Sequence, residues 1–355
     1  MAVKAYLTER REAIARFLQA ELGEVEAEFQ RVSPWGRDVA RRLLDFAIRG
    51  KMIRGGLVAM GAGLFGHEPD EDIVRAGAVA ELIQSFLLVH DDIMDRDTAR
   101  RGESAVFYQY ATVARDEGIE DWYHLGEALG TCVGDVAMLY AFNMLEGLSC
   151  PNEVARRVRS LFSREITWVG LAQMSDLYYG ETTRDVTETE IIDLYRFKTG
   201  RYTFSLPLSV GAVLAGQGES AVTALGQLGE KLGVIFQIKD DEMGLFGDEE
   251  RIGKPLGSDI AENKKTLFRQ YLFARADASE RVRLEEIFGS RAVSPEMVGT
   301  VRELIVRHGV RREVDTLVES WAEAARADIA RIAADTGADV TMLGELLDYN
   351  LSRNV

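Results

Sequence analysis

Apolar residues recur at spacings of three and four along nearly the whole chain, the spacing of amphipathic helices. The first such segment covers residues 4–31, where Leu7, Ile14 and Leu18 share one face, and the segment ends at Pro34. No segment shows the sustained alternation of apolar and polar residues that indicates a strand. The pattern therefore predicts an all-α protein.

The same spacing gives boundaries for the other helices. Thr187 and Glu190 form a capping-box pattern, and Ser294 precedes a proline at the first helical position. We expect helices over residues 4–31, 37–48, within 51–66, 69–95, 106–116, 124–147, 151–179, 188–215, 219–245, 265–275, 278–289, 295–307, 310–334 and 339–352. With no low-complexity linker and no solenoid-length repeat, residues 1–355 are expected to form a single all-α domain, a helical bundle whose core faces can hold a polar site.

One apolar helix, residues 81–95, ends in a group of carboxylates. Asp91 and Asp95 are four residues apart, so they lie on one helix face, and Asp92 lies beside them. Carboxylates this close repel one another unless a positive charge neutralises them. Oxygen ligands of this kind suit Mg²⁺, which is often shared with a substrate phosphate. Arg100 and Arg101 follow directly, so this stretch predicts a site for a metal ion and a phosphate group.

A second apolar helix ends in the same way. Gln237, Asp240, Asp241 and Gly244 fall on one helix face at the end of the apolar run 232–238. Two such helix ends facing each other would hold metal ions around a diphosphate. Two clusters of the same construction are much stronger evidence for a metal site than one, because a single acidic helix end is usually only solvated.

Basic side chains stand near both acidic clusters in small groups. Lys51 and Arg54 are three residues apart on one face, Lys198 lies in the run from Tyr195 to Gly200, and Lys254 precedes a proline. In an acidic protein these cations suggest two phosphate sites, one bound through metal and one through cations alone. For any one of these basic residues taken alone, an ordinary surface ion pair is the alternative to a phosphate site.

Composition narrows the class of partner. The formal net charge of −16 argues against nucleic acid and against an anionic membrane surface, but not against a phosphorylated small molecule bound through metal ions. No signal-peptide apolar region and no uncharged run of membrane-spanning length occurs, so we expect a soluble, cytoplasmic protein with no membrane span. The two cysteines form no metal-type or redox-type pair.

Together these residues resemble the trans-isoprenyl diphosphate synthase family, the polyprenyl synthetases, closest to short-chain geranylgeranyl and farnesyl diphosphate synthases. Five separated motifs between about residues 50 and 266 carry the resemblance. They are Gly50-Lys51-x-x-Arg54, Asp91-Asp92-x-x-Asp95 with Arg100-Arg101-Gly102, Lys198-Thr199, Gln237-x-x-Asp240-Asp241, and the run from Phe246 through Lys254 to Asp259. The resemblance implies an isoprenoid-synthase bundle with a central active-site cavity, and a homodimer.

The resemblance also implies a role for each matching residue. The expected ligands of a cluster of about three Mg²⁺ ions are Asp91, Asp92, Asp95, Asp240 and Asp241. The allylic diphosphate is expected at Arg100, Lys198 and Lys254, and isopentenyl diphosphate at Lys51, Arg54, Gln84 and Arg101. Thr199 and Gln237 resemble dipoles that stabilise the carbocation, and Gln173 and Asp176 resemble supporting residues.

Product length is expected to depend on the residues preceding Asp91. At a rise of about 1.5 Å per residue, positions four and five residues back are about 6–7.5 Å deeper along the helix. Helical geometry puts Leu87 below Asp91 and Phe86 about 140° round the helix axis. The resemblance instead implies that Phe86, five residues before the first aspartate, determines the length of the product. Phe86 with a non-aromatic Leu87 resembles archaeal-type geranylgeranyl synthases, and the small Ser85 offers a neighbouring path.

The resemblance therefore implies a Mg²⁺-dependent prenyltransferase that condenses isopentenyl diphosphate with allylic diphosphates. The product that we expect is geranylgeranyl diphosphate. Farnesyl diphosphate and longer products stay open as alternatives. A terpene cyclase usually lacks the cations matched here by Lys51, Arg54, Arg100 and Arg101. An inactive partner subunit of a heteromeric synthase usually loses an acidic motif, whereas here only the second motif is shortened, at Gly244.

Overall fold

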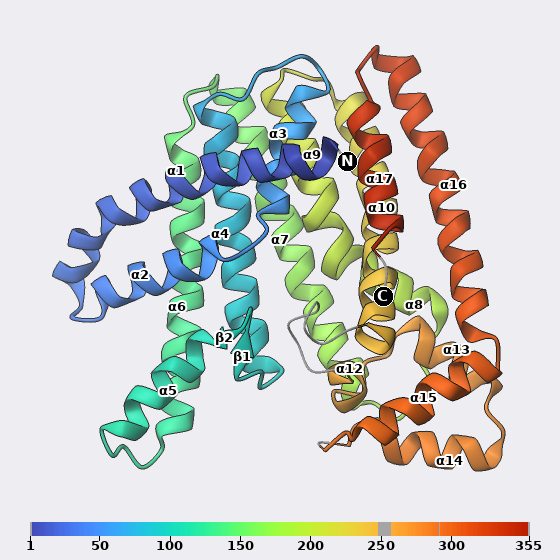
Figure 1. The fold of residues 1–355 in the computed structure, drawn as a ribbon. Coiled ribbons are helices and arrows are strands. Elements are labelled where there is room, and N and C mark those ends of the chain that lie inside the picture. The colour runs from blue at the N-terminus through green and yellow to red at the C-terminus, as the bar shows by residue number, and fades with distance from the viewer. Residues whose placement is uncertain (1, 248–256, 291, 354–355) are drawn as a thin grey trace. The chain divides into compact units, whose positions relative to one another are not determined.

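The computed structural model describes residues 2–247, 257–290 and 292–353 (Figure 1). The chain folds into two compact units, Met1–Ser160 with Val210–Gln217, and Leu161–Ser209 with Gly218–Val355. Almost all the regular structure is helical, which confirms the all-α prediction. The prediction of a single domain over residues 1–355 stays a prediction.

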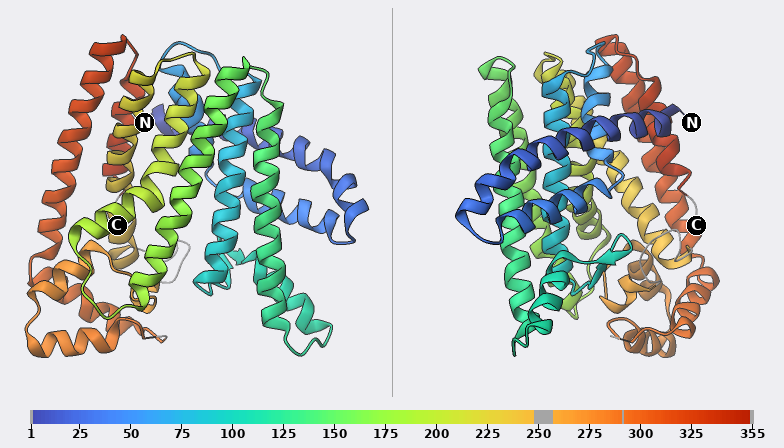
Figure 2. Two further views of the ribbon diagram at one scale, coloured as in Figure 1. Left: turned by 180° about the vertical axis from the view of Figure 1, so that it is seen from behind. Right: turned by 60° about the vertical axis from the view of Figure 1, so that its left-hand side comes forward.

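The first unit is built around one long buried helix. Its elements are α1 (Ala2–Val32), α2 (Gly36–Ile48), α3 (Ile53–Gly63), α4 (Glu71–Met94), β1 (Ala99–Arg100), β2 (Glu103–Ser104), α5 (Val106–Asp116), α6 (Trp122–Met144), η1 (Leu145–Gly147), the start of α7 (Asn152–Glu181) and the end of α9 (Leu206–Leu214). Helix α4 packs against α1, α3 and α6, and Figures 1 and 2 show α4 and α6 running alongside each other. Asp70 caps α4 by accepting the Ile73 N–H at 3.0 Å, which fixes where this core helix begins.

A close contact between His90 and Gly134 fixes how far α4 is shifted along α6. A Cβ atom added at Gly134 of α6 would lie 2.1 Å from the Nε2 atom of His90 on α4. The His90 ring therefore fills the space that any larger residue at position 134 would need. The acidic end of α4 directly follows His90, so this contact also holds the first carboxylate cluster in place.

The second unit is organised around helix α10. Its elements are the rest of α7, α8 (Glu188–Leu194), the π-helix η2 (Tyr195–Ser205), the start of α9, α10 (Glu219–Phe246), α12 (Ser258–Ala261), α13 (Leu267–Arg275), α14 (Ala278–Ile287), α15 (Pro295–Arg307), α16 (Val310–Thr336) and α17 (Thr341–Leu351). Helix α10 packs against η2, α16 and α17. A Cβ atom added at Gly233 of α10 would lie 2.0 Å from the Gly200 Cα of η2, so the two backbones touch.

Two local features differ from the sequence prediction. The helix expected over residues 188–215 is divided into α8, the π-helical η2 and α9. Residues 96–105, which lie between two expected helices, contain the short antiparallel pair β1–β2. Single-turn π-bulges in helices occur frequently at functional sites, and this longer π-segment carries Lys198 and Thr199.

Among the described residues, two helices are long and apolar enough to cross a membrane, Glu71–Met94 and Trp122–Gly147. The first is mostly buried inside its unit, and the core helix of a water-soluble protein meets the same criteria. The expectation of no membrane span therefore stays a prediction.

Candidate active site

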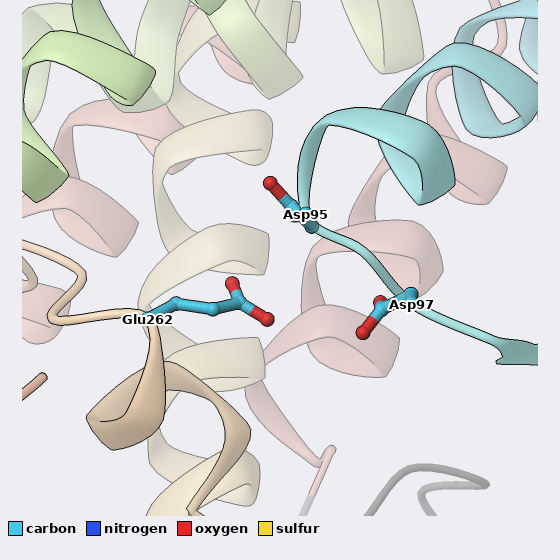
Figure 3. A group of neighbouring side chains, drawn as sticks. All are labelled: Asp95, Asp97 and Glu262. Carbon is cyan, nitrogen blue, oxygen red and sulfur yellow. The ribbon is translucent and has the colours of Figure 1, made fainter. Parts of the chain in front are cut away.

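The first acidic cluster lies where α4 ends. The Asp95 N–H donates to the Asp91 carbonyl at 2.8 Å, so the last helical turn carries both residues. Figure 3 shows Asp95 at this end and Asp97 in the loop that follows; Glu262, also drawn there, belongs to the second unit. Asp95 and Asp97 offer carboxylate oxygens within 4.8 Å of each other. Asp97 is a candidate ligand that the sequence interpretation missed, although it lies only two residues beyond Asp95.

Asp92 is held differently from its neighbours. Its side chain is fully buried, and its Oδ1 accepts the Arg100 Nε–H at 2.6 Å. Burial raises the pKa of Asp92 to about 7, even though the Arg100 guanidinium lowers it. Arg100 also donates to Asp97 at 3.0 Å and lies 3.8 Å from Asp91. Asp92 therefore orients a guanidinium group beside the acidic helix end.

A tight hairpin turn directs the side chains of the adjacent Arg100 and Arg101 to different partners. Arg100 pairs with Glu103, and the two residues between them, Arg101 and Gly102, have φ values of 55° and 77°. Positive φ at both central positions is the signature of the type I′ turn, which glycine favours at the second position. The Arg101 guanidinium reaches back to α2, donates to the Phe46 carbonyl at 2.7 Å and stacks over the Phe46 ring.

Two predicted phosphate-binding arginines lie near one buried carboxylate. Glu81 of α4 is 4% exposed and accepts the Gly55 N–H at 2.8 Å. Burial raises the pKa of Glu81, whereas the charges of Arg54 and Arg101 lower it. One carboxylate facing two guanidinium groups leaves a net positive charge, as a diphosphate site needs. Sequence reasoning missed Glu81, although a lone glutamate in an apolar helix is a visible signal.

The remaining predicted residues of the first unit lie on α3 and α4 or just before them. Lys51 is exposed and Gln84 is buried. Phe86 is 5% exposed, and its ring meets the His90 ring edge-to-face with centroids 5.8 Å apart. Ser85 is buried with its hydroxyl donating to the Glu81 carbonyl, whereas Leu87 is only half-buried.

The second acidic cluster is built from α10 and the π-helix. Asp241 is 4% exposed, and its oxygens accept the Tyr195 hydroxyl and the Gln237 amide, the latter at 2.8 Å. The Thr199 hydroxyl donates to the Gln237 Oε1 at 2.8 Å, and Tyr195 accepts the Leu267 N–H at 3.1 Å. Burial, together with nearby carboxylate charges, holds the pKa of Asp241 well above its usual range.

Asp240 lies beside this network and is exposed. Its Oδ1 accepts from Arg353 at 3.0 Å, and the Arg353 guanidinium stacks 3.8 Å from the centroid of the Phe236 ring. A Cβ atom added at Gly244 would lie 3.1 Å from the Asp259 Oδ2. The second acidic motif has glycine, not aspartate, at position 244, and the carboxylate of Asp259 lies close to that position.

The remaining predicted residues are the phosphate-binding lysines Lys198 and Lys254 and the supporting residues Gln173 and Asp176. Lys198 of η2 forms an ion pair with Asp176 of α7, and Gln173 lies three residues earlier on the same helix. The structure thus brings Lys198 to one of the two supporting residues. Lys254 lies outside the described residues.

The carboxylates fit a hard divalent cation. Asp91, Asp95 and Asp97 are half-buried rather than sealed, and their oxygens are the ligand type that Mg²⁺ prefers. Asp92 and Asp241 are buried and already accept hydrogen bonds, so they suit a supporting role. The second unit also has a cavity of about 530 Å³, and no predicted site residue lines it.

An almost entirely helical fold with carboxylates near the ends of two helices and guanidinium groups beside them suits the binding of metal ions and a diphosphate. Residues 37–305 match the sequence model of the polyprenyl synthetase family. The chain belongs to this family and is a prenyltransferase, as the sequence predicted.

Three similar proteins illustrate the range within the family. Geranylgeranyl diphosphate synthase of Sulfolobus acidocaldarius is 32% identical over 269 residues, 75% of this chain and 76% of that one. Geranylfarnesyl diphosphate synthase of Aeropyrum pernix is 30% identical over 310 residues, 86% and 90% of the two chains. A crystal structure of geranylgeranyl pyrophosphate synthase from Corynebacterium glutamicum, complexed with isoprenyl diphosphate and magnesium, has a TM-score of 0.89 at 27% identity, covering 98% and 99%.

Proposed function

We propose that this prenyltransferase makes geranylgeranyl diphosphate from isopentenyl diphosphate and shorter allylic diphosphates. The observation that carries the product length is the position of Phe86, which is buried on α4 five residues before Asp91 and held edge-on by His90. In this proposal the product tail passes Leu87, directly below Asp91, and ends at the Phe86 ring. The geranylgeranyl synthases among the similar proteins support the same length.

The residues of each cluster have separate tasks in this proposal. Asp91, Asp95 and Asp240 bind Mg²⁺, which when bound stabilises the negative charge of the departing diphosphate. Asp92 and Asp241 support these ligands. Arg100, Lys198 and Lys254 bind the allylic diphosphate, and the charges they place there favour ionisation of its carbon–oxygen bond.

The second substrate binds through cations alone. Lys51, Arg54 and Arg101 bind the diphosphate of isopentenyl diphosphate, with Gln84 beside them. The net positive charge left around Glu81 supports this assignment. The double bond of isopentenyl diphosphate then attacks the allylic cation, whose charge the Thr199 and Gln237 oxygens stabilise, and the departing diphosphate takes the proton that is lost.

The hydrogen-bond directions support the roles of Thr199 and Gln237. Thr199 donates to Gln237, and Gln237 donates to Asp241, so the chain of dipoles ends on a carboxylate. Gln173 and Asp176 support Lys198, which Asp176 contacts directly. We further propose that the enzyme is a cytoplasmic homodimer.

The test is incubation with isopentenyl diphosphate, Mg²⁺ and, separately, dimethylallyl, geranyl and farnesyl diphosphate, with the products identified by mass. The proposal predicts that each primer is extended and that elongation stops at the C20 diphosphate. Farnesyl or a longer diphosphate as the end product would contradict the role of Phe86. A cyclic hydrocarbon from one allylic substrate would contradict the synthase reaction itself, and no turnover with any primer would indicate a non-catalytic subunit.

A further inference from the structure

A small cavity in the second unit gathers positive side chains that the proposed reaction does not use. It has a volume of about 80 Å³ and is lined by α13, α14 and the segments that precede α8 and α13. The polar residues that line it are Asp185, Lys265, Arg269, Gln270 and Arg281.

Lys265 is a largely buried residue whose ammonium group has no ion pair among the described residues. It is 6% exposed, and among the described residues no hydrogen bond or ion pair reaches its ammonium group. Burial, followed by repulsion from Arg269, lowers the pKa of Lys265 to about 8. An anion bound beside the ammonium group would offset both this loss of hydration and the repulsion from Arg269.

Two neighbouring side chains on α13 also present unsatisfied atoms. The Arg269 Nε and the Gln270 Oε1 are buried and have no hydrogen-bond partner among the described residues. The Arg269 guanidinium stacks over Phe273 at 4.1 Å and over Phe288 at 5.2 Å, which fixes its plane. Arg269 is therefore preorganised to donate hydrogen bonds, and Gln270 offers either an acceptor or, with its amide turned, a donor.

The third cation of the cavity is already neutralised. Arg281 donates to both oxygens of Asp185 at 3.1 Å and to Glu285 at 3.4 Å. Around the cavity the three cations exceed the two carboxylates, Asp185 and Glu285, by one positive charge. This excess charge and the donor groups of Lys265 and Arg269 suit a small anion with several acceptor oxygens.

We propose that this cavity binds a single phosphate group, with Lys265 and Arg269 donating to its oxygens. The cavity is small, at about 80 Å³, and five of its eight lining residues are polar or charged, which suits a phosphate group rather than a prenyl chain. The N-terminus of α13, capped by Thr266 through the Arg269 N–H, adds favourable potential for an anion. The ligand is inorganic phosphate or the phosphate end of a monoester.

The experiment measures thermal unfolding against phosphate concentration at constant ionic strength, with chloride as the exchanged anion. Wild type, Lys265→Met and Arg269→Gln are compared, and Lys4→Met, at an exposed position of α1, is the matched lysine control. The midpoint phosphate concentration should rise at least about tenfold in Lys265→Met and Arg269→Gln, and stay unchanged in Lys4→Met. In chloride alone, Lys265→Met should unfold at a higher temperature than wild type, because it removes a cation that Arg269 repels.

Equal phosphate midpoints for wild type, Lys265→Met and Arg269→Gln would overturn the proposal, since phosphate would then act elsewhere on the molecule. If Lys265→Met does not fold, Arg269→Gln decides the question alone. A parallel titration with methyl phosphate separates the two ligand sources. Binding as tight as that of inorganic phosphate indicates a monoester headgroup, and much weaker binding indicates the free anion.

Discussion

The two acidic helix ends have nearly the same sequence pattern, yet the chain balances their buried carboxylates in different ways. At the end of α4, buried Asp92 is paired with the charged Arg100 guanidinium. On α10, the groups among the described residues that donate to buried Asp241 are neutral, the Tyr195 hydroxyl and the Gln237 amide. The exposed Asp240 takes the guanidinium instead, from Arg353.

This difference shows that the pattern of aspartates does not determine what neutralises them. A charged partner stabilises the ionised form of a buried carboxylate more strongly than neutral dipoles do. Burial raises the pKa of both carboxylates. The Arg100 guanidinium lowers that of Asp92, which lies at about 7, whereas repulsion from Asp259 raises that of Asp241 further. The first buried carboxylate is therefore balanced by a charged group and the second by hydrogen bonds.

The largest effect is expected from removing a carboxylate that binds metal. Asp91→Ala should lower turnover by about a thousandfold or more, because each such ligand stabilises charge that develops as diphosphate leaves. The melting temperature should stay near that of wild type, since Asp91 is half-buried and not part of the core. Asp116→Ala, at an exposed position of α5, is the matched control. Near wild-type turnover in Asp91→Ala would remove the metal assignment of the first cluster.

Each helix end also carries a phenylalanine, and the two should behave differently. Phe86→Ala should lengthen the product, because it removes a buried ring from the proposed path of the tail. Phe236→Ala, four residues before Asp240, should leave the product length unchanged, since that ring stacks against Arg353. Mass analysis of the products checks both variants. An unchanged product spectrum in Phe86→Ala would move the length limit to Leu87 or Ser85.

The charged pair of Asp92 and Arg100 on α4 should contribute more to the free energy of unfolding than the neutral hydrogen bonds to Asp241 on α10. Asp92→Ala leaves the largely buried Arg100 without its closest counter-ion and should lower the free energy of unfolding by about 3 kcal/mol. Denaturant unfolding measures this value. A loss of less than about 1 kcal/mol would show that Asp97 and Asp91 compensate fully.

Tyr195→Phe should have a smaller effect at the second end. The variant removes a donor to Asp241 and an acceptor of the Leu267 N–H, and should cost about 1–3 kcal/mol because both groups are buried. The same denaturant series provides the measurement. If Tyr195→Phe costs more than Asp92→Ala, the ranking of charged over neutral partners is wrong.

The smallest effect is expected at the surface of the second end. Arg353→Ala removes an ion pair to an exposed aspartate and should change stability by less than about 1 kcal/mol. Its effect should appear instead as an altered Mg²⁺ requirement, because Asp240 loses a competing cation. A Mg²⁺ titration of turnover that matches wild type would show that this contact does not influence the metal site.

Most helices could be predicted from the sequence because their signals are local. The cap of α4 at Asp70 and the capping box at Thr187 and Glu190 define helix starts within a few residues. The aspartates at the end of α4 lie on one helical turn, as their spacing indicated.

Other features depend on contacts between distant segments, which spacing does not reveal. The π-helix η2 packs through Gly200 against Gly233, so its register depends on α10. Arg100 reaches Asp92 because the chain turns back after α4, where Arg96 has a φ of 58° and the Asp97 N–H donates to the Asp92 carbonyl at 2.8 Å. The buried Lys265 belongs to a run of polar residues that gave no sign of burial. For these residues the sequence shows the chemical group but not its partner.

The central claim is that both acidic helix ends bind divalent metal ions together with the allylic diphosphate. The most direct measurement counts bound Mn²⁺, as a substitute for Mg²⁺, by electron paramagnetic resonance in the presence of an allylic thiolodiphosphate that does not ionise. The account predicts about three ions per chain in wild type and fewer in both Asp91→Asn and Asp240→Asn. An unchanged count in either variant would contradict the claim for that helix end.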